Sequence, residues 1–83
     1  MKLRGKTIHT REQEALCALL ISARKTAGLS QAGLAKKLKR PQSFIAKYEG
    51  GERRLDLIEF VFISQTLGTD PVMLLRAFLR SIG

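Results

Sequence analysis

The chain of 83 residues has a single cysteine, Cys17, and a single histidine, His9. One cysteine cannot close an internal disulfide, and one cysteine with one histidine cannot supply the four ligands of a structural zinc site. No apolar run approaches the roughly 20 residues of a membrane-spanning helix, and the first residues, MKLRGK, lack the apolar segment of a secretory signal. The sequence therefore predicts a cytoplasmic protein that has no metal, no cofactor and no place in a membrane.

Acidic residues are also scarce. Seven Asp and Glu stand against fifteen Lys and Arg, which gives a net charge of +8 and a pI near 10.4. Such a balance indicates a polyanionic partner, with nucleic acid first and an anionic membrane surface second. Residues 30–54 carry a net charge of +5, whereas residues 55–83 carry −1. We expect one end of the molecule to bind an anion and the other end to have a different task.

Apolar residues recur at helical spacing, and no segment alternates polar and apolar residues as a half-buried strand does. The length suits a single core, so we expect one compact all-α domain. Polar residues that commonly cap helix N-termini precede four of the apolar segments. The expected helices cover about residues 11–27, 31–38, 41–48 and 57–67, and a fifth begins at residue 71 after Asp70.

Residues 1–9 are basic and form an expected N-terminal arm, and residues 10–83 form the expected domain. Lys2, Arg4 and Lys6 leave two interpretations open for the arm. It enters a DNA groove, or it is a soluble terminus with no contact of its own.

Two short helices joined by a tight turn and flanked by basic residues are one solution for reading a DNA duplex. The run LSQAGLAKKLKRPQSFIAKYEGGERRL, residues 29–55, closely resembles the Cro/cI-type or XRE-like helix-turn-helix family. The resemblance covers roughly residues 20–75. It rests on Gln31, Leu34, Ala35, Leu38, Gln42, Ser43, Ile45, Tyr48 and Glu49.

This resemblance implies a five-helix domain of the lambda-repressor-like type, in which the second and third helices form the helix-turn-helix. It also implies that the protein binds double-stranded DNA and regulates transcription. We expect Leu34, Leu38 and Ile45 to form the apolar seam between the two helices, and Ala35 to be small because the helices cross closely there.

The resemblance places the base-reading positions at Gln42, Ser43 and Lys47, at the start of the third helix and one turn further on. A glutamine amide can form a bidentate pair with adenine, whereas a lysine can donate to guanine or to a phosphate. Lys47 thus has two possible targets.

Contacts to the DNA backbone are expected from residues around the same helix. The resemblance places Gln31 at the start of the second helix, where free amides already attract a phosphate. Arg40 lies in the turn before the third helix, and Arg53 and Arg54 lie in the loop after it, so we expect a phosphate clamp. A solvated charged face is the plainer interpretation of such a run. By the same resemblance, Arg24 and Glu49 form a structural ion pair between the first and third helices.

Three residues depart from the family pattern. Lys39 occupies a turn position where glycine is common, which predicts a left-handed lysine or a different turn. Gly33 lowers helix propensity, and Pro41 offers no side-chain acceptor for the first amides of the third helix.

The last two helices carry more apolar residues than one core-facing stripe needs, which indicates a partner. On the fourth helix we expect a core face of Leu57, Phe60, Val61, Ser64 and Leu67. We expect the remaining apolar surface to form a homodimer interface, which would present two reading helices about 34 Å apart. The expected interface residues are Phe62, Met73, Leu75, Phe78, Leu79 and Ile82.

The resulting hypothesis is a small transcriptional regulator, a repressor that occupies a palindromic operator as a homodimer. Related small proteins also activate transcription through RNA polymerase. The alternative is the antitoxin of a toxin-antitoxin pair, in which the apolar end holds the toxin. Membrane binding is disfavoured because the bases lie away from the most apolar helix. Catalysis is disfavoured because His9 has no evident partner, and Cys17 is expected to be a small buried apolar residue.

Overall fold

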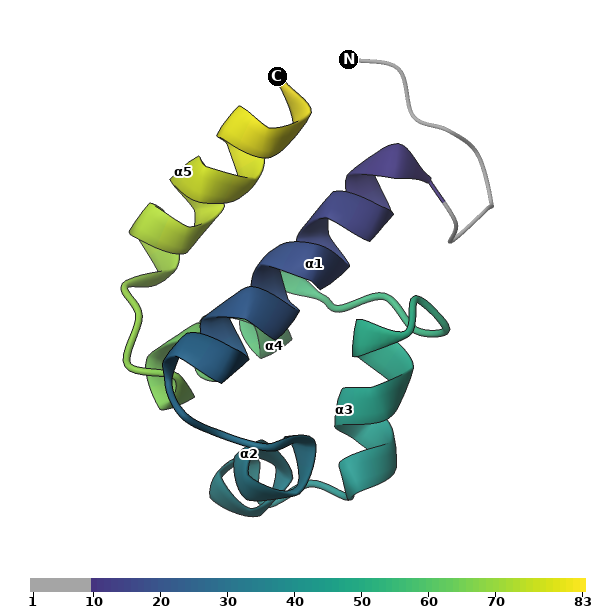
Figure 1. Cartoon of the computed structure of the whole chain (residues 1–83), viewed down its shortest axis with the longest axis vertical. Coiled ribbons are helices and arrows are strands. Elements are labelled where there is room, and N and C mark those ends of the chain that lie inside the picture. Colours follow the sequence, from purple (N-terminus) through teal and green to yellow (C-terminus); the bar gives the residue numbers. More distant parts are fainter. Residues whose placement is uncertain (1–9) are drawn as a thin grey trace.

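The computed structural model describes residues 10–83, so the expected basic arm of residues 1–9 lies outside the described residues. The described part folds into five helices and contains no strand, which confirms the predicted all-α architecture (Figure 1). The helices are α1 (Arg11–Thr26), α2 (Gln31–Leu38), α3 (Gln42–Glu49), α4 (Leu57–Thr66) and α5 (Pro71–Ile82).

The long helix α1 runs through the middle of the domain, with α5 packed beside it along much of its length (Figure 1). The short helices α2 and α3 pack against each other at one end, where α3 also contacts α1 and α2 also contacts α4. The helix-turn-helix is therefore fixed from two sides by the rest of the domain.

The start signals identified in the sequence cap the helices as expected. Thr10 and Ser30 each accept a hydrogen bond from a backbone amide in the first turn of their helix. Asp56 forms a full capping box with Glu59, since each side chain bonds the other residue's backbone amide, at 2.7 and 3.0 Å. Asp70 caps α5 ahead of a proline. Pro41 is the N-cap residue that precedes α3, and it provides no side-chain cap, also as expected.

The core forms where α1, α2, α3 and α4 converge. Leu34 and Ile45 are fully buried at the seam between α2 and α3, and Ala35 is nearly so, as the sequence predicted. Leu38 is only half-buried at the edge of this seam. Close packing here fixes the relative position of the two helices.

The turn between α2 and α3 keeps the usual geometry despite its unusual residue. Lys39 takes the left-handed conformation, with φ 57° and ψ 44°. Its amide donates to the carbonyl of Lys36, and the amide of Arg40 donates to that of Ala35. The first of the two alternatives for this lysine is therefore correct: the turn is retained and the lysine adopts a conformation that favours glycine.

The predicted core face of α4 is wrong at one end. Leu57 is 71% exposed, and Ile63, which the sequence pattern did not single out, is 1% exposed. The helix is apolar on most of its sides, so periodicity does not select the buried face. Phe60 and Ser64 are buried as expected, and the Ser64 hydroxyl donates to the carbonyl of Phe60 at 2.7 Å.

No single helix within residues 10–83 has both the length and the apolar character to cross a membrane. Only α4 and α5 taken together are long and apolar enough, and the two helices are bent by 112° relative to each other.

Candidate nucleic-acid interface

Helix α3 divides into a buried face and an exposed face. Phe44, Ile45 and Tyr48 pack into the domain, together with the carboxylate of Glu49. The other face is exposed to solvent along its whole length, and it contains Gln42, Ser43, Ala46 and Lys47. The three residues predicted to read bases are therefore together on one outer surface.

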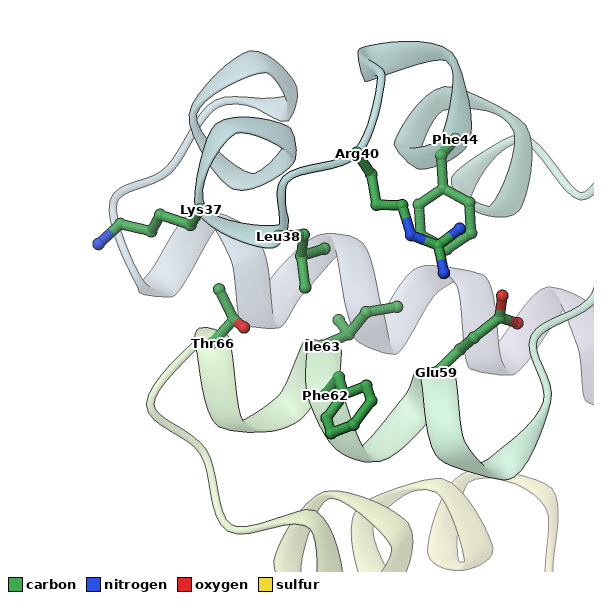
Figure 2. Close-up of a pocket in the computed structure, with 8 residues that line it drawn as sticks. All are labelled: Lys37, Leu38, Arg40, Phe44, Glu59, Phe62, Ile63 and Thr66. Atoms are coloured by element: carbon green, nitrogen blue, oxygen red, sulfur yellow. The ribbon is translucent and has the colours of Figure 1, made fainter.

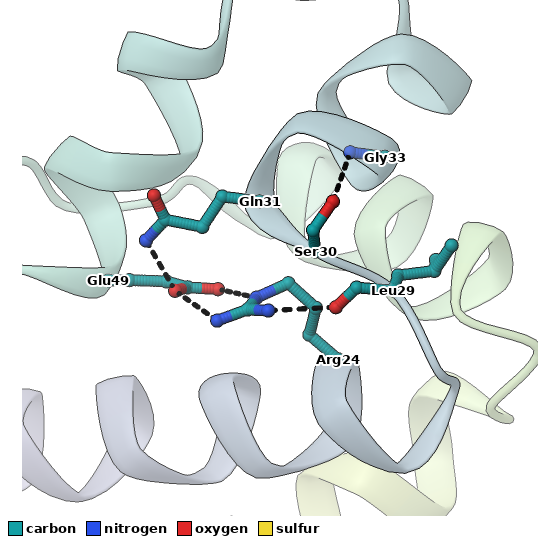
Figure 3. Close-up of polar contacts among 6 residues, drawn as sticks. All are labelled: Arg24, Leu29, Ser30, Gln31, Gly33 and Glu49. Atoms are coloured by element: carbon teal, nitrogen blue, oxygen red, sulfur yellow. Dashed lines mark hydrogen bonds and ion pairs between the residues drawn. The ribbon is translucent and has the colours of Figure 1, made fainter.

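A buried polar network holds α3 against its neighbours (Figure 3). Arg24 of α1 donates to both carboxylate oxygens of Glu49, from Nε at 2.8 Å and from Nη2 at 3.1 Å. Its Nη1 donates to the carbonyl of Leu29 at 2.8 Å, so the guanidinium also fixes the entry to α2. Arg24 and Glu49 are 8% and 7% exposed, and the hydrogen bond to Glu49 is the main cause that raises the pKa of Arg24.

Gln31 joins the same network from α2. Its amide nitrogen donates to Oε1 of Glu49 at 3.0 Å (Figure 3). The carboxylate of Glu49 therefore links three helices through side chains of α1, α2 and α3. A contact from Gln31 to a DNA phosphate stays a prediction, and such a contact would have to use the second amide hydrogen.

A second polar cluster surrounds the ring of Phe44. The guanidinium groups of Arg40 and Arg53 lie 4.7 and 4.9 Å from the ring centroid. Arg53 also donates to both oxygens of Glu59, at 2.9 and 2.7 Å. The ring thus holds two arginines, one before and one after α3, close to the helix.

Glu59 is the acidic centre of this cluster. The hydrogen bonds from Arg53, followed by the bond from the amide of Asp56, lower the pKa of Glu59 to about 2. The Glu59 side chain is 12% exposed, whereas that of Arg53 is 40% exposed. Arg53, which the sequence marked as a phosphate contact, is therefore already paired within the domain.

Sequence analysis predicted neither Glu59 nor Phe44 as part of the site. The sequence signal for the cluster was an acidic residue, Glu59, that follows the arginine pair Arg53 and Arg54 by five to six positions. Arg54, the other predicted clamp residue in this loop, is exposed, and its carbonyl accepts from Nη1 of Arg53 at 2.9 Å.

Cys17 and Tyr48 lie behind α3. Cys17 is buried and its thiol donates to the carbonyl of Tyr48 at 3.1 Å, as expected for a small buried residue. The Tyr48 hydroxyl is buried and has no hydrogen-bond partner within the described residues. Burial raises the pKa of this hydroxyl. Residues 10–83 contain no group of three or more His, Cys, Asp or Glu side chains that could hold a metal ion.

The far end of the domain exposes apolar side chains of α4 and α5. Phe62, Met73, Leu75 and Leu79 of the predicted dimer interface are more than 40% exposed, whereas Phe78 and Ile82 are half-buried. Large exposed apolar residues outside the predicted set are Leu57, Ile58 and Val72.

These exposed residues do not all border the same hollow. Leu75 and Phe78 line an apolar hollow of about 180 Å³ between α1, α4 and α5, together with Leu57. Phe62 lines a different hollow beside the helix-turn-helix, with Leu38 and Arg40. The predicted interface residues are thus divided between two sides of α4.

Comparisons with known proteins agree with this geometry. The family model described as Helix-turn-helix matches residues 20–74. The structure is similar to that of an XRE-family like protein from Pseudomonas syringae pv. tomato str. DC3000, with 46% identity and a TM-score of 0.82. That alignment covers 92% of this chain and 93% of the other.

A second structure shares the fold at low sequence identity. It is a tyrosine-to-phenylalanine mutant of the restriction-modification controller protein C.Esp1396I, with 20% identity and a TM-score of 0.80. The alignment covers 88% of this chain and 92% of that protein. No curated protein matches the chain.

Proposed function

Since this chain belongs to the XRE-type helix-turn-helix family of DNA-binding transcription regulators, we propose that it represses transcription by occupying a palindromic operator as a homodimer. The observation that carries the proposal is the outer face of α3, on which Gln42, Ser43 and Lys47 stand together in solvent. In this family mode the second helix of the motif enters the major groove with its N-terminal residues against the bases.

The assigned base contacts follow from side-chain chemistry. Gln42 pairs with adenine through its amide, Ser43 donates to or accepts from a neighbouring base, and Lys47 donates to guanine or to a phosphate. The buried pair of Arg24 and Glu49 supports this assignment, because a reading helix has to keep its orientation when it enters the groove.

The assigned backbone contacts are Gln31, Arg40, Arg53 and Arg54. Arg40 has the most favourable position, since it is exposed in the turn before α3 and its guanidinium is held in place by the ring of Phe44. An arginine that is already ordered loses less side-chain freedom when it binds a phosphate. Arg53 would have to share its donors between Glu59 and the DNA.

The proposed homodimer uses the exposed apolar residues of α5. Leu75 and Leu79 lie on its outer side, and the hollow lined by Leu75, Phe78 and Leu57 offers a place for an apolar side chain of a second copy. To bind a palindromic operator, the two-fold axis has to place both α3 helices on one side of a duplex, about 34 Å apart. Phe62 borders the other hollow, so its position gives less support for a place in this interface.

Selection of bound duplexes from a random pool, at two salt concentrations, tests the proposal. We expect an enriched inverted repeat. Gln42→Ala should weaken binding by roughly 1 to 3 kcal/mol and relax one base position in each half-site. Arg40→Ala should weaken all sequences alike and reduce the salt dependence. Gln65→Ala is the matched control, because Gln65 is an exposed glutamine on α4.

Recovery of no motif, with binding that depends only on ionic strength, would contradict sequence-specific regulation. The solution mass of the full chain separates the two proposed uses of the apolar end. A dimer supports the homodimer, whereas a monomer that becomes stable only with a second, unrelated small protein supports the antitoxin alternative.

A further inference from the structure

A hollow of about 240 Å³ lies between the helix-turn-helix and α4, beside the turn that leads into α3 (Figure 2). Four of the eight residues that line it are apolar, and the other four are polar or charged: Leu38, Phe44, Phe62 and Ile63, and Lys37, Arg40, Glu59 and Thr66. An apolar cavity of about 150 Å³ accepts benzene. This hollow therefore has room for one aromatic ring with a short polar arm.

The hollow has a positive end. The guanidinium of Arg40 lies over the ring of Phe44 and is directed into the hollow (Figure 2). Within the described residues it makes this ring contact but no hydrogen bond or ion pair. Its N–H groups therefore have no acceptor within the described residues, although its charge is attracted to the carboxylate of Glu59 and helps to lower the pKa of that group.

The other charged groups at the hollow do not cancel this charge. Glu59 also lines the hollow, but both of its oxygens accept from Arg53, so the two arginines and the carboxylate leave one positive charge uncompensated. Lys37 contributes its stem to the lining, while its ammonium points away from the hollow (Figure 2). Arg40 therefore determines the charge of a molecule that fits.

We propose that this hollow binds a small aromatic monocarboxylate, with its ring against Leu38 and Phe62 and its carboxylate on Arg40. An aromatic ring suits walls that include two phenylalanines, and a carboxylate suits the planar fork of a guanidinium. The occupant takes up the side chain that is assigned to a DNA phosphate and adds a negative charge at the same place. It therefore lowers DNA affinity, and this second part rests on the proposed function.

Phenylacetate is a suitable probe, because it consists of one ring and one carboxylate. Titration of the isotope-labelled full chain, followed by amide chemical shifts, should move the signals of Leu38, Arg40, Ile63 and Thr66, with a Kd of about 0.1 to 1 mM. Phenylacetamide has the same shape without the charge, and acetate has the charge without the ring. Both should bind about tenfold more weakly or not at all.

Two arginine variants locate the charge. Arg40→Gln should weaken phenylacetate binding about tenfold, and Arg76→Gln, on the exposed side of α5, should leave it unchanged. The unfolding temperatures of both variants establish that they fold. Shifts that are equally strong with phenylacetamide, that persist in Arg40→Gln, or that are absent altogether would overturn the site.

The effect on DNA binding is measured separately. The affinity of the protein for the selected duplex is compared in phenylacetate and in acetate at the same concentration. We expect affinity several-fold weaker in phenylacetate. If phenylacetate binds but the DNA affinity is the same in phenylacetate and in acetate, the effect on DNA binding is overturned and the binding site is not. A protein that binds phenylacetate but selects no duplex would refute the proposed function and leave the binding site established.

Discussion

Arg53 and Glu59 form a two-point ion pair, with both terminal nitrogens of the arginine bonded to the two oxygens of the carboxylate at 2.9 and 2.7 Å. The pair joins the loop after α3 to the first turn of α4. In the proposed DNA complex Arg53 also contacts a phosphate, so the carboxylate and the DNA would compete for the same donors.

Replacing Glu59 by glutamine should therefore strengthen DNA binding. Gln at this position still accepts from the amide of Asp56, so the cap of α4 is kept while one negative charge is lost. We expect affinity to rise about threefold to tenfold on all sequences alike, and the salt slope to steepen by about 0.9. Fluorescence anisotropy over a range of salt concentrations measures both. Asp70→Asn, which removes one negative charge at the start of α5 and retains a capping residue, should change neither.

The same carboxylate makes stability dependent on acid. The pKa of Glu59 is lowered from its ordinary value of 4.5 to about 2, so its contribution is complete above about pH 4.5 and is lost as the pH falls toward 2. After allowance for the partly solvated Arg53, this contribution is about 1 to 2 kcal/mol. Urea unfolding at neutral and at acidic pH should show a larger loss for the wild type than for Glu59→Gln. An equal loss in both proteins would show that other carboxyl groups are responsible.

The buried pair of Arg24 and Glu49 should be costly to break at one side. Arg24→Ala leaves a desolvated carboxylate and should lower the free energy of unfolding by about 3 to 5 kcal/mol, a large part of what an 83-residue domain has. Replacing both residues by methionine should recover much of this loss, because no buried charge then remains. Chemical denaturation of the single and double variants decides this, with Arg76→Ala as the exposed control. A double variant less stable than Arg24→Ala would contradict the expectation.

Replacing Tyr48, in contrast, should not destabilise the fold. Its hydroxyl is buried and unpaired within the described residues, so Tyr48→Phe removes a desolvated polar group while it keeps the ring. The free energy of unfolding should stay the same or rise by up to about 1 kcal/mol. Thermal or urea unfolding measures this, and a clear destabilisation would mean that the hydroxyl has a partner beyond residues 10–83.

Much of the fold could be predicted because local signals and the family resemblance agree. Capping residues such as Ser30 and Asp70 mark helix starts through short-range hydrogen bonds that depend little on the rest of the chain. The wrong prediction that Leu57 is buried has the opposite cause. On a helix that is apolar almost all round, the buried face is selected by the neighbours in space, which the sequence of the helix does not reveal.

The charged residues of the site show a similar limit. Arg24 and Glu49 were matched only through the resemblance, since residues 25 positions apart give no local signal of contact. For Arg53, its place in a basic run suggested a free cation, and the ion pair with Glu59 depends on how the loop after α3 folds back onto α4. Sequence thus identified the cations around α3 but not which of them the protein already uses.

The left-handed conformation of Lys39 lowers the stability of the fold but keeps a positive charge in the turn between α2 and α3. A lysine in this conformation costs about 1 kcal/mol more than a glycine would. A glycine at this position would raise the unfolding temperature of the domain. It would also remove a cation from the turn that joins the two helices of the motif. The protein accordingly keeps a slightly weaker fold together with a more basic corner.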